Sequence, residues 1–202
     1  MQQTDLKTDG TLLAGRLALS SLDAPLVLAL NSGSLPVARD VAIWLGGELD
    51  RIFVEGMDVP SESGRYSGAV SETGHLALEH ADGGHAGSEE AFALDILNHI
   101  LRLVERRVAA SPGTGLADSS GRNVILVADG LAGGATMVAA IRGVRSRQPL
   151  RLVAAIGCAP SRTLDRIRRE ADETVALSTV ENIGDVGRAR RTLRLVTPAT
   201  AP

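Results

Sequence analysis

Lysine, aromatic residues and cysteine are all scarce in this 202-residue chain. Lys7 is the only lysine and lies far from any glycine cluster, which excludes a Walker A loop and a pyridoxal Schiff base. The four aromatic residues are too few for the stacking platforms of proteins that bind single-stranded nucleic acid. The one cysteine, Cys158, cannot form an internal disulfide, and we expect it to be a small buried residue of the core.

Long hydrophobic runs are also missing, since no stretch approaches the roughly 20 apolar residues of a membrane span. Residues 1–10 carry no secretory signal pattern, so we expect a cytoplasmic protein with no membrane partner. The net charge of −3 hides an asymmetry, because residues 138–202 hold 12 arginines against 6 acidic residues. These arginines recur in helix-like stretches, which favours a solvated helix face, and we expect no nucleic-acid partner.

Short apolar strands alternate with helical patterns along the chain. The expected strands cover residues 26–30, 51–54, 124–127, 150–156 and 174–177. The expected helices cover residues 36–45, 88–110, 137–147 and 161–170. This alternation predicts an α/β fold in which a parallel twisted sheet is flanked by helices.

We expect a single domain over residues 1–202, with a core at about 22–54 and 88–180, a divergent insert at about 55–87 and a frayed tail at 197–202. Trp44 lies on an apolar face of its expected helix and is predicted to be in the core. The long helix is expected to begin at an N-cap, Ser88. Its predicted buried stripe comprises Phe92, Ile96, Leu97, Ile100, Val104 and Val108.

The insert carries a weak hairpin signal, with residues 68–70 and 75–79 on either side of residues 72–74. It also holds a group that resembles a metal cluster in composition: His75, His80 and His85 with Glu79 and Asp82. The spacing of these residues matches no usual zinc pattern. We therefore predict a solvated loop here and no metal held by the protein.

A glycine-rich loop connects strand 124–127 directly to a helix, and ligands of open α/β sheets lie beyond the carboxyl ends of the strands. The glycines let the backbone approach an anion, and the helix N-terminus offers N–H groups. The predicted phosphate cradle comprises Gly130, Leu131, Ala132, Gly133, Gly134, Ala135 and the hydroxyl of Thr136. Asp129 is placed to accept hydrogen bonds from sugar hydroxyls. A tight turn in which Asp129 caps the helix explains the pattern equally well.

Residues 122–145, RNVILVADGLAGGATMVAAIRGVR, resemble the signature of type I phosphoribosyltransferases, in which a hydrophobic strand ends in two acids before a Thr/Gly loop and a helix. Residues 26–54 and 156–177 are similar to the opening and closing segments of one bacterial branch of that family, whereas 55–120 match poorly. The resemblance implies a parallel sheet with a small hood. It also implies a phosphoribosyl pyrophosphate substrate that carries Mg²⁺, glycosyl transfer to or from a nitrogenous base, and a possible homodimer.

Three departures from the family pattern concern the reacting end of the substrate. Ala128 takes the position of the first acid and leaves Asp129 as the catalytic carboxylate. Glu55 stands where the branch has an arginine-lysine pair. In the pyrophosphate loop, an arginine-glycine-glycine turn is replaced by Ser32, Gly33 and Ser34. We expect these changes to weaken transfer or abolish it. The alternative function is a degenerate member that binds a nucleotide or sugar phosphate for regulation or assembly, and a purely structural role would need no phosphate ligand.

Overall fold

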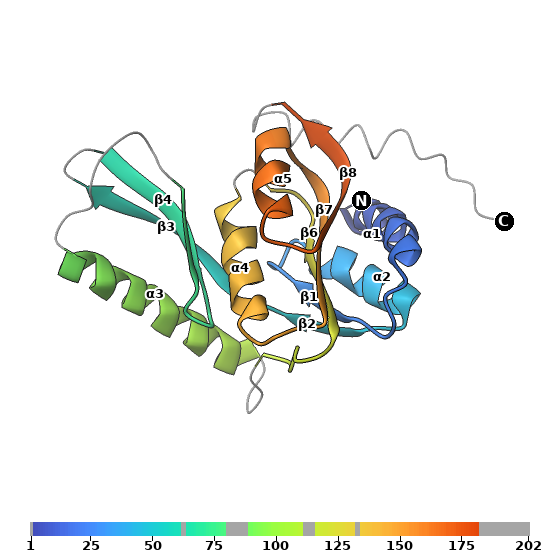
Figure 1. Cartoon of the computed structure of the whole chain (residues 1–202), viewed down its shortest axis with the longest axis horizontal. Helices are drawn as coiled ribbons and strands as arrows, with labels where there is room; N and C mark the ends of the chain where they lie inside the picture. The colour runs from blue at the N-terminus through green and yellow to red at the C-terminus, as the bar shows by residue number, and fades with distance from the viewer. Residues whose placement is uncertain (1, 62–63, 80–88, 111–115, 132–133, 182–202) are drawn as a thin grey trace.

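The computed structural model describes residues 2–61, 64–79, 89–110, 116–131 and 134–181 (Figure 1). Its larger sheet has five strands in the order β2-β1-β6-β7-β8, and every neighbouring pair is parallel. The strands are β1 (Leu26–Ala29), β2 (Glu48–Arg51), β6 (Asn123–Ala128), β7 (Arg151–Pro160) and β8 (Glu173–Val180). The predicted parallel sheet flanked by helices is therefore confirmed.

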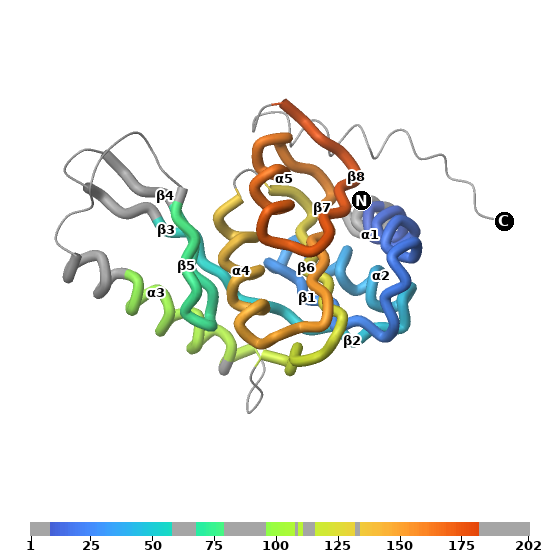
Figure 2. The backbone as a smooth tube through the Cα atoms, viewed as in Figure 1, coloured from blue at the N-terminus to red at the C-terminus, as the bar shows by residue number. Residues whose placement is uncertain are grey.

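Helices cover both faces of this sheet, as Figure 2 shows. Helices α1 (Gln2–Leu17) and α2 (Leu35–Leu45) lie on one face, and α4 (Ala135–Arg145) and α5 (Ser161–Arg168) lie on the other. Successive side chains of β6 point to opposite faces, so Val127 packs towards α1 and α2 while Leu126 packs towards α4. A strand that is covered on both faces is apolar where it is buried, which is why β1 and residues 124–128 of β6 are continuous apolar runs.

Helix α1, which is followed by a short 3-10 turn η1 (Ala18–Ser20), was not expected from the sequence. The helix buries Leu13, Ala14 and Leu17 against α2 and the sheet. No helix among the described residues is long and apolar enough to cross a membrane.

A separate antiparallel sheet contains β3 (Val54–Ser61), β4 (Gly64–Ser71) and β5 (Leu76–Glu79). The predicted hairpin around residues 72–74 is confirmed, and its turn closes with a 2.8 Å hydrogen bond from the Gly74 N–H to the Ser71 carbonyl. The single strand predicted at 51–54 is wrong. Arg51 ends β2 in the larger sheet and Val54 begins β3 in the smaller one, so Ile52 and Phe53 carry the chain between the two sheets.

Helix α3 (Glu89–Ala110) packs on the smaller sheet through Ile96, Ile100 and Leu103. The predicted stripe is wrong at Leu97 and Val104, which are 50% and 44% exposed. Leu103 and Arg107 complete the inward face instead, because residues three and four apart share one side of a helix. The predicted N-cap Ser88 and the side chains of Phe92 and Val108 lie outside the described residues.

Two predictions about individual core residues have opposite outcomes. Cys158 is fully buried in β7 and forms no disulfide, as expected. Trp44 was expected in the core but is 61% exposed. The buried face of α2 is formed by small and branched side chains, and Trp44 lies on the other side of the helix.

Candidate functional site

Asp129 lies at the carboxyl end of β6, and its side chain is nearly buried with 9% exposure. The loop between β1 and α2 meets it there. A Cβ atom added to Gly33 would lie 3.3 Å from Oδ2 of Asp129 and 3.2 Å from Oδ1 of Asn31. Two loops almost 100 residues apart in the sequence, around Gly33 and around Asp129, therefore meet at one edge of the sheet, as parallel strands require.

Strand β7 fixes the position of the chain after β6. A Cβ atom at Gly157 would overlap the carbonyl of Asp129, so the two backbones are in direct contact. One step further, the Leu131 N–H donates a 2.9 Å hydrogen bond to the Cys158 carbonyl. The Leu131 side chain is buried in the core next to α4. This part of the predicted cradle therefore uses its N–H group within the protein, and the loop is held against β7.

Helix α4 begins directly after the loop, with Gly134 at the N-cap position. Because its N-cap residue is a glycine, this helix has no capping side chain of its own at that position. Gly134 and Ala135 are buried, and Thr136 is half-buried on the first turn. The other two residues of the predicted cradle, Ala132 and Gly133, lie outside the described residues.

The β1–α2 loop is a tight turn built around Ser34, which is fully buried. The Asn31 N–H donates to the Ser34 Oγ at 3.0 Å, and the Ser34 N–H donates to Oδ1 of Asn31 at 2.9 Å. The hydroxyl of Ser34 also lies 3.0 Å from the Asn31 carbonyl. Ser34 therefore organises the turn from the inside, while Ser32 and Gly33 are exposed on its outer side.

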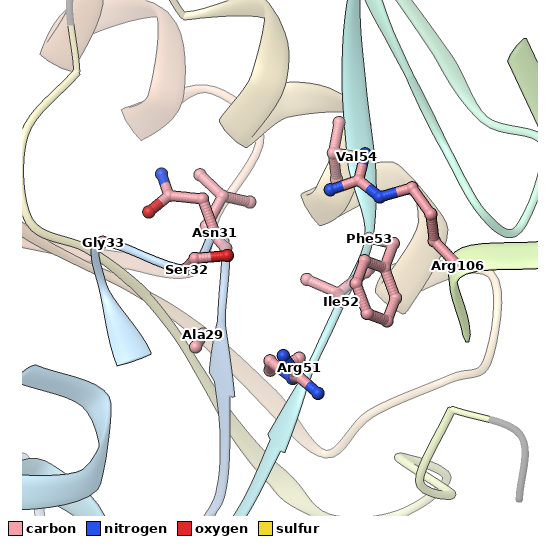
Figure 3. A pocket seen from close by; sticks show the side chains of 10 residues that line it. Ala29, Asn31, Ser32, Gly33, Arg51, Ile52, Phe53, Val54 and Arg106 are labelled. Carbon is pink, nitrogen blue, oxygen red and sulfur yellow. The ribbon is translucent and has the colours of Figure 1, made fainter. Parts of the chain in front are cut away.

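A cavity of about 290 Å³ opens between this loop and the crossover from β2 to β3 (Figure 3). Asn31, Ser32 and Gly33 form one wall, as Figure 3 shows. Ile52, Phe53 and Val54 form the opposite wall, with contributions from Arg51 and from Arg106 of α3. The sequence prediction included the three loop positions 32–34 but neither arginine.

Comparison with known proteins agrees with this arrangement. The family model described as the phosphoribosyl transferase domain matches residues 8–189. The chain belongs to the phosphoribosyl transferase family. The family resemblance of the sequence is thereby confirmed, and the fold expected from it as well.

Individual phosphoribosyl transferase relatives cover most of the chain. A Mycobacterium tuberculosis H37Rv protein, Rv0571c, which is provisionally named as a phosphoribosyl transferase, is 33% identical over 186 residues. The match covers 90% of this chain and 41% of that protein, so the chain spans about two fifths of the length of this relative. The protein TT1426 from Thermus thermophilus has 31% identity and a TM-score of 0.70, with 96% of this chain and 98% of that chain covered.

The same fold occurs in a purine phosphoribosyltransferase from Pyrococcus horikoshii, which is 13% identical. The TM-score is 0.50, and 90% of this chain and 87% of that chain are covered. At this level of identity the likeness concerns the fold alone.

The departures from the phosphoribosyl transferase pattern take definite places in the structure. Ala128 is fully buried among core residues that include Leu126 and Ile156. Glu55 does not line the cavity, because successive residues of β3 point in opposite directions and Val54 faces it instead. The carboxylate of Glu55 pairs with Arg102 of α3 at 3.7 Å. The Glu55 carboxylate therefore has a cationic partner on α3 and is not among the residues that line the cavity.

Next to Phe53, a largely buried ion-pair network joins α3 to both sheets. Arg107 lies 2.6 Å from Glu72 and 3.1 Å from Asp50, and it also donates to the Arg51 carbonyl. Glu72 in turn accepts a 2.9 Å hydrogen bond from the Phe53 N–H. Burial alone would lower the pKa of Arg107, but hydrogen bonding and attraction from Glu72, followed by Asp50, outweigh it and raise that pKa. The guanidinium thus stays charged and fixes the crossover.

The histidine segment is described only in part. Nδ1 of His75 lies 3.1 Å from the hydroxyl of Thr73, within the β4–β5 turn. His80, Asp82 and His85 lie outside the described residues, as does the side chain of Glu79. Among the residues that the structure describes, no three His, Cys, Asp or Glu side chains are grouped closely enough to hold a metal ion.

Proposed function

We propose that this chain binds a phosphoribosyl ligand at the Asp129–Thr136 loop and transfers the ribosyl group to or from a nitrogenous base. The observation that carries the proposal is the position of Asp129, nearly buried between the Gly33 turn and the start of α4. A carboxylate at this place can accept hydrogen bonds from two neighbouring ribose hydroxyls. The first turn of α4 and the hydroxyl of Thr136 are suited to a 5′-phosphate, because helix N-termini attract anions.

In this reaction the bond between the anomeric carbon and the diphosphate oxygen breaks, a bond from that carbon to a nitrogen of the base forms, and the proton of that nitrogen is released to solvent. The electron pair of the broken bond leaves with diphosphate. Asp129 orients the ribose so that the base meets the anomeric carbon on the face opposite to the leaving group, and the phosphate cradle holds the other end of the sugar. Magnesium would be carried by the diphosphate oxygens of the substrate and would neutralise their charge, and the carboxylate of Asp129 could join its ligands.

A second function is favoured by the burial of Ala128 in the core, since it leaves Asp129 without a neighbouring acid. The chain would then bind a nucleotide or sugar phosphate in a regulatory or assembly role and would not turn it over. The two functions share the Asp129–Thr136 loop and differ only in the transfer step.

Calorimetry and a product assay together test the proposal. Wild-type protein should bind phosphoribosyl diphosphate with Mg²⁺, and Asp129→Asn should weaken binding about tenfold because charged hydrogen bonds to the ribose are lost. The matched control is Asp23→Asn, an exposed position before the opposite, amino end of β1. It should bind like the wild type.

Release of inorganic diphosphate is then measured with a panel of purine and pyrimidine bases. Release that depends on both the base and Asp129 supports the transferase. Binding of the ligand without release supports the binding module. If the protein binds neither phosphoribosyl diphosphate nor nucleotides, both functions are overturned.

A further inference from the structure

Three guanidinium groups surround the ring of Phe53, at the point where the chain crosses between the sheets. The Cζ atoms of Arg51, Arg106 and Arg107 lie 5.4, 5.5 and 4.8 Å from the ring centroid. At such distances an aromatic face attracts a guanidinium group and holds its orientation. Phe53 therefore acts as a platform that gathers positive charge from β2 and from α3.

The three arginines differ in their other contacts. Arg107 is buried and is paired with Glu72 and Asp50. Neither Arg51 nor Arg106 forms an ion pair with any residue that the structure describes, and Arg106 is exposed. Arg51 is half-buried and Arg106 is exposed, and both are available to an external anion, whereas the charge of Arg107 is already neutralised.

Both available arginines line the cavity beside the β1–α2 loop (Figure 3). No acidic side chain is among the residues that line it. The opposite wall adds the Ser32 hydroxyl and the backbone N–H groups of the exposed turn at Ser32 and Gly33. The polar groups around this space are thus mainly hydrogen-bond donors, which is the composition of an anion site.

We infer that Arg51 and Arg106 form a two-arginine clamp for a diphosphate group, with Phe53 as its support. The inference rests on the proposed function for the identity of the whole ligand, since the cavity adjoins Asp129 through Gly33. A planar guanidinium binds phosphate oxygens in a bidentate manner, and two of them can hold both phosphates of a diphosphate. Positive charge at this end of the ligand then comes from α3 and the end of β2, while Glu55 of β3 pairs with Arg102 outside the cavity.

Binding of inorganic diphosphate, measured by calorimetry at low ionic strength, tests the clamp. Arg106→Gln and Arg51→Gln should each weaken binding roughly tenfold, and the double variant more strongly. The matched control is Arg169→Gln, an exposed arginine at the end of α5 with no ion pair among the described residues. It should bind diphosphate like the wild type. Arg106→Lys should recover only part of the affinity, because an ammonium group keeps the charge and loses the fork.

The outcomes separate this inference from the proposed function. Inorganic diphosphate has no ribose, so its binding reports on the two arginines without requiring the ribose contacts proposed for Asp129. Equal affinity of the wild type, Arg51→Gln and Arg106→Gln would overturn the clamp, and so would a wild type that binds no diphosphate at millimolar concentration. The protein could bind diphosphate through both arginines and yet fail to bind phosphoribosyl ligands. That result would support the clamp and overturn the proposed function. Thermal unfolding of Arg106→Gln should match the wild type, since the side chain is exposed.

Discussion

The guanidinium of Arg107 lies 2.6 Å from the carboxylate of Glu72, and both side chains are only 6% exposed. Arg107→Met would leave Glu72 buried without its counter-charge, so we expect the free energy of unfolding to fall by about 3–5 kcal/mol. The control Arg102→Met removes the more exposed 3.7 Å pair with Glu55 and should cost less than about 1 kcal/mol. Urea unfolding followed by far-ultraviolet circular dichroism measures both variants. Equal losses would contradict a special role for the buried pair.

Because Gly157 and Asp129 are in close contact, we expect that adding even one methyl group at position 157 of β7 lowers stability. Gly157→Ala forces the Asp129 carbonyl to move, and we expect a loss of about 1–3 kcal/mol in stability together with weaker binding of phosphoribosyl diphosphate. Gly15→Ala is the matched control, because an added Cβ meets nothing within 4 Å on the exposed side of α1. It should be neutral or stabilising by up to about 1 kcal/mol. A Gly157→Ala variant with wild-type stability and affinity would show that this contact does not position Asp129.

Two serines of one turn should respond differently to the loss of their hydroxyl groups. Ser34→Ala leaves the Asn31 N–H without its acceptor inside the protein, and we expect a cost of about 1–3 kcal/mol. Ser32→Ala changes an exposed side chain and should leave the midpoint of thermal unfolding unchanged. If Ser34→Ala melts with the wild type, the bonds from the Ser34 N–H to Asn31 are enough to hold the turn without the hydroxyl.

Asp172 links the stability of β7 and β8 to pH. Burial would raise its pKa, but hydrogen bonds from Arg145 and from the Leu152 N–H outweigh this, and its pKa is lowered from the ordinary 3.8. The stabilisation is therefore complete above the pKa of the unfolded chain and is lost as the pH falls through the lower, folded-state pKa. Asp172→Asn should cost about 1 kcal/mol or less at neutral pH, since the pair is partly exposed.

The measurement for Asp172 is denaturant unfolding of wild type and variant from neutral pH down to about pH 2. The difference in stability should disappear at the acidic end, where the wild-type carboxyl is protonated. The control Asp165→Asn removes a well-exposed pair with Arg168 and should unfold like the wild type at neutral pH. A difference that persists unchanged at low pH would mean that the charge of Asp172 contributes nothing.

The larger sheet could be predicted from the sequence because its strands are short apolar runs that end in turn residues. The same pattern gave a wrong prediction at residues 51–54, because this stretch contains the end of β2 and the start of β3. No residue type at Ile52 indicates that the chain passes from one sheet to the other there. Helix α1 was missed because glycines, threonines and charged residues interrupt its apolar positions. Its helical form depends on packing against α2, which no local pattern records.

The candidate site was predictable to the extent that it is local. Asp129 and the residues up to Thr136 connect strand β6 to helix α4. A loop that follows a parallel strand lies at the carboxyl edge of the sheet, so the sequence alone predicts its position. Arg106 enters through tertiary structure alone, because the packing of α3 on the smaller sheet decides which of its side chains reach the cavity. The sequence placed Arg51 at the start of an expected strand, but it did not predict that Arg106 lies close to it in space.

The exposed position of Trp44 determines how much the tryptophan fluorescence of this protein changes when it unfolds. It is the only tryptophan in the chain, and its indole is already largely in water when the protein is folded. Denaturation should therefore shift its fluorescence emission by little, even while both sheets come apart. The same ring stands on the outer side of the helix that leads away from the Ser34 turn, so a quencher added from solution reaches it freely in the native molecule.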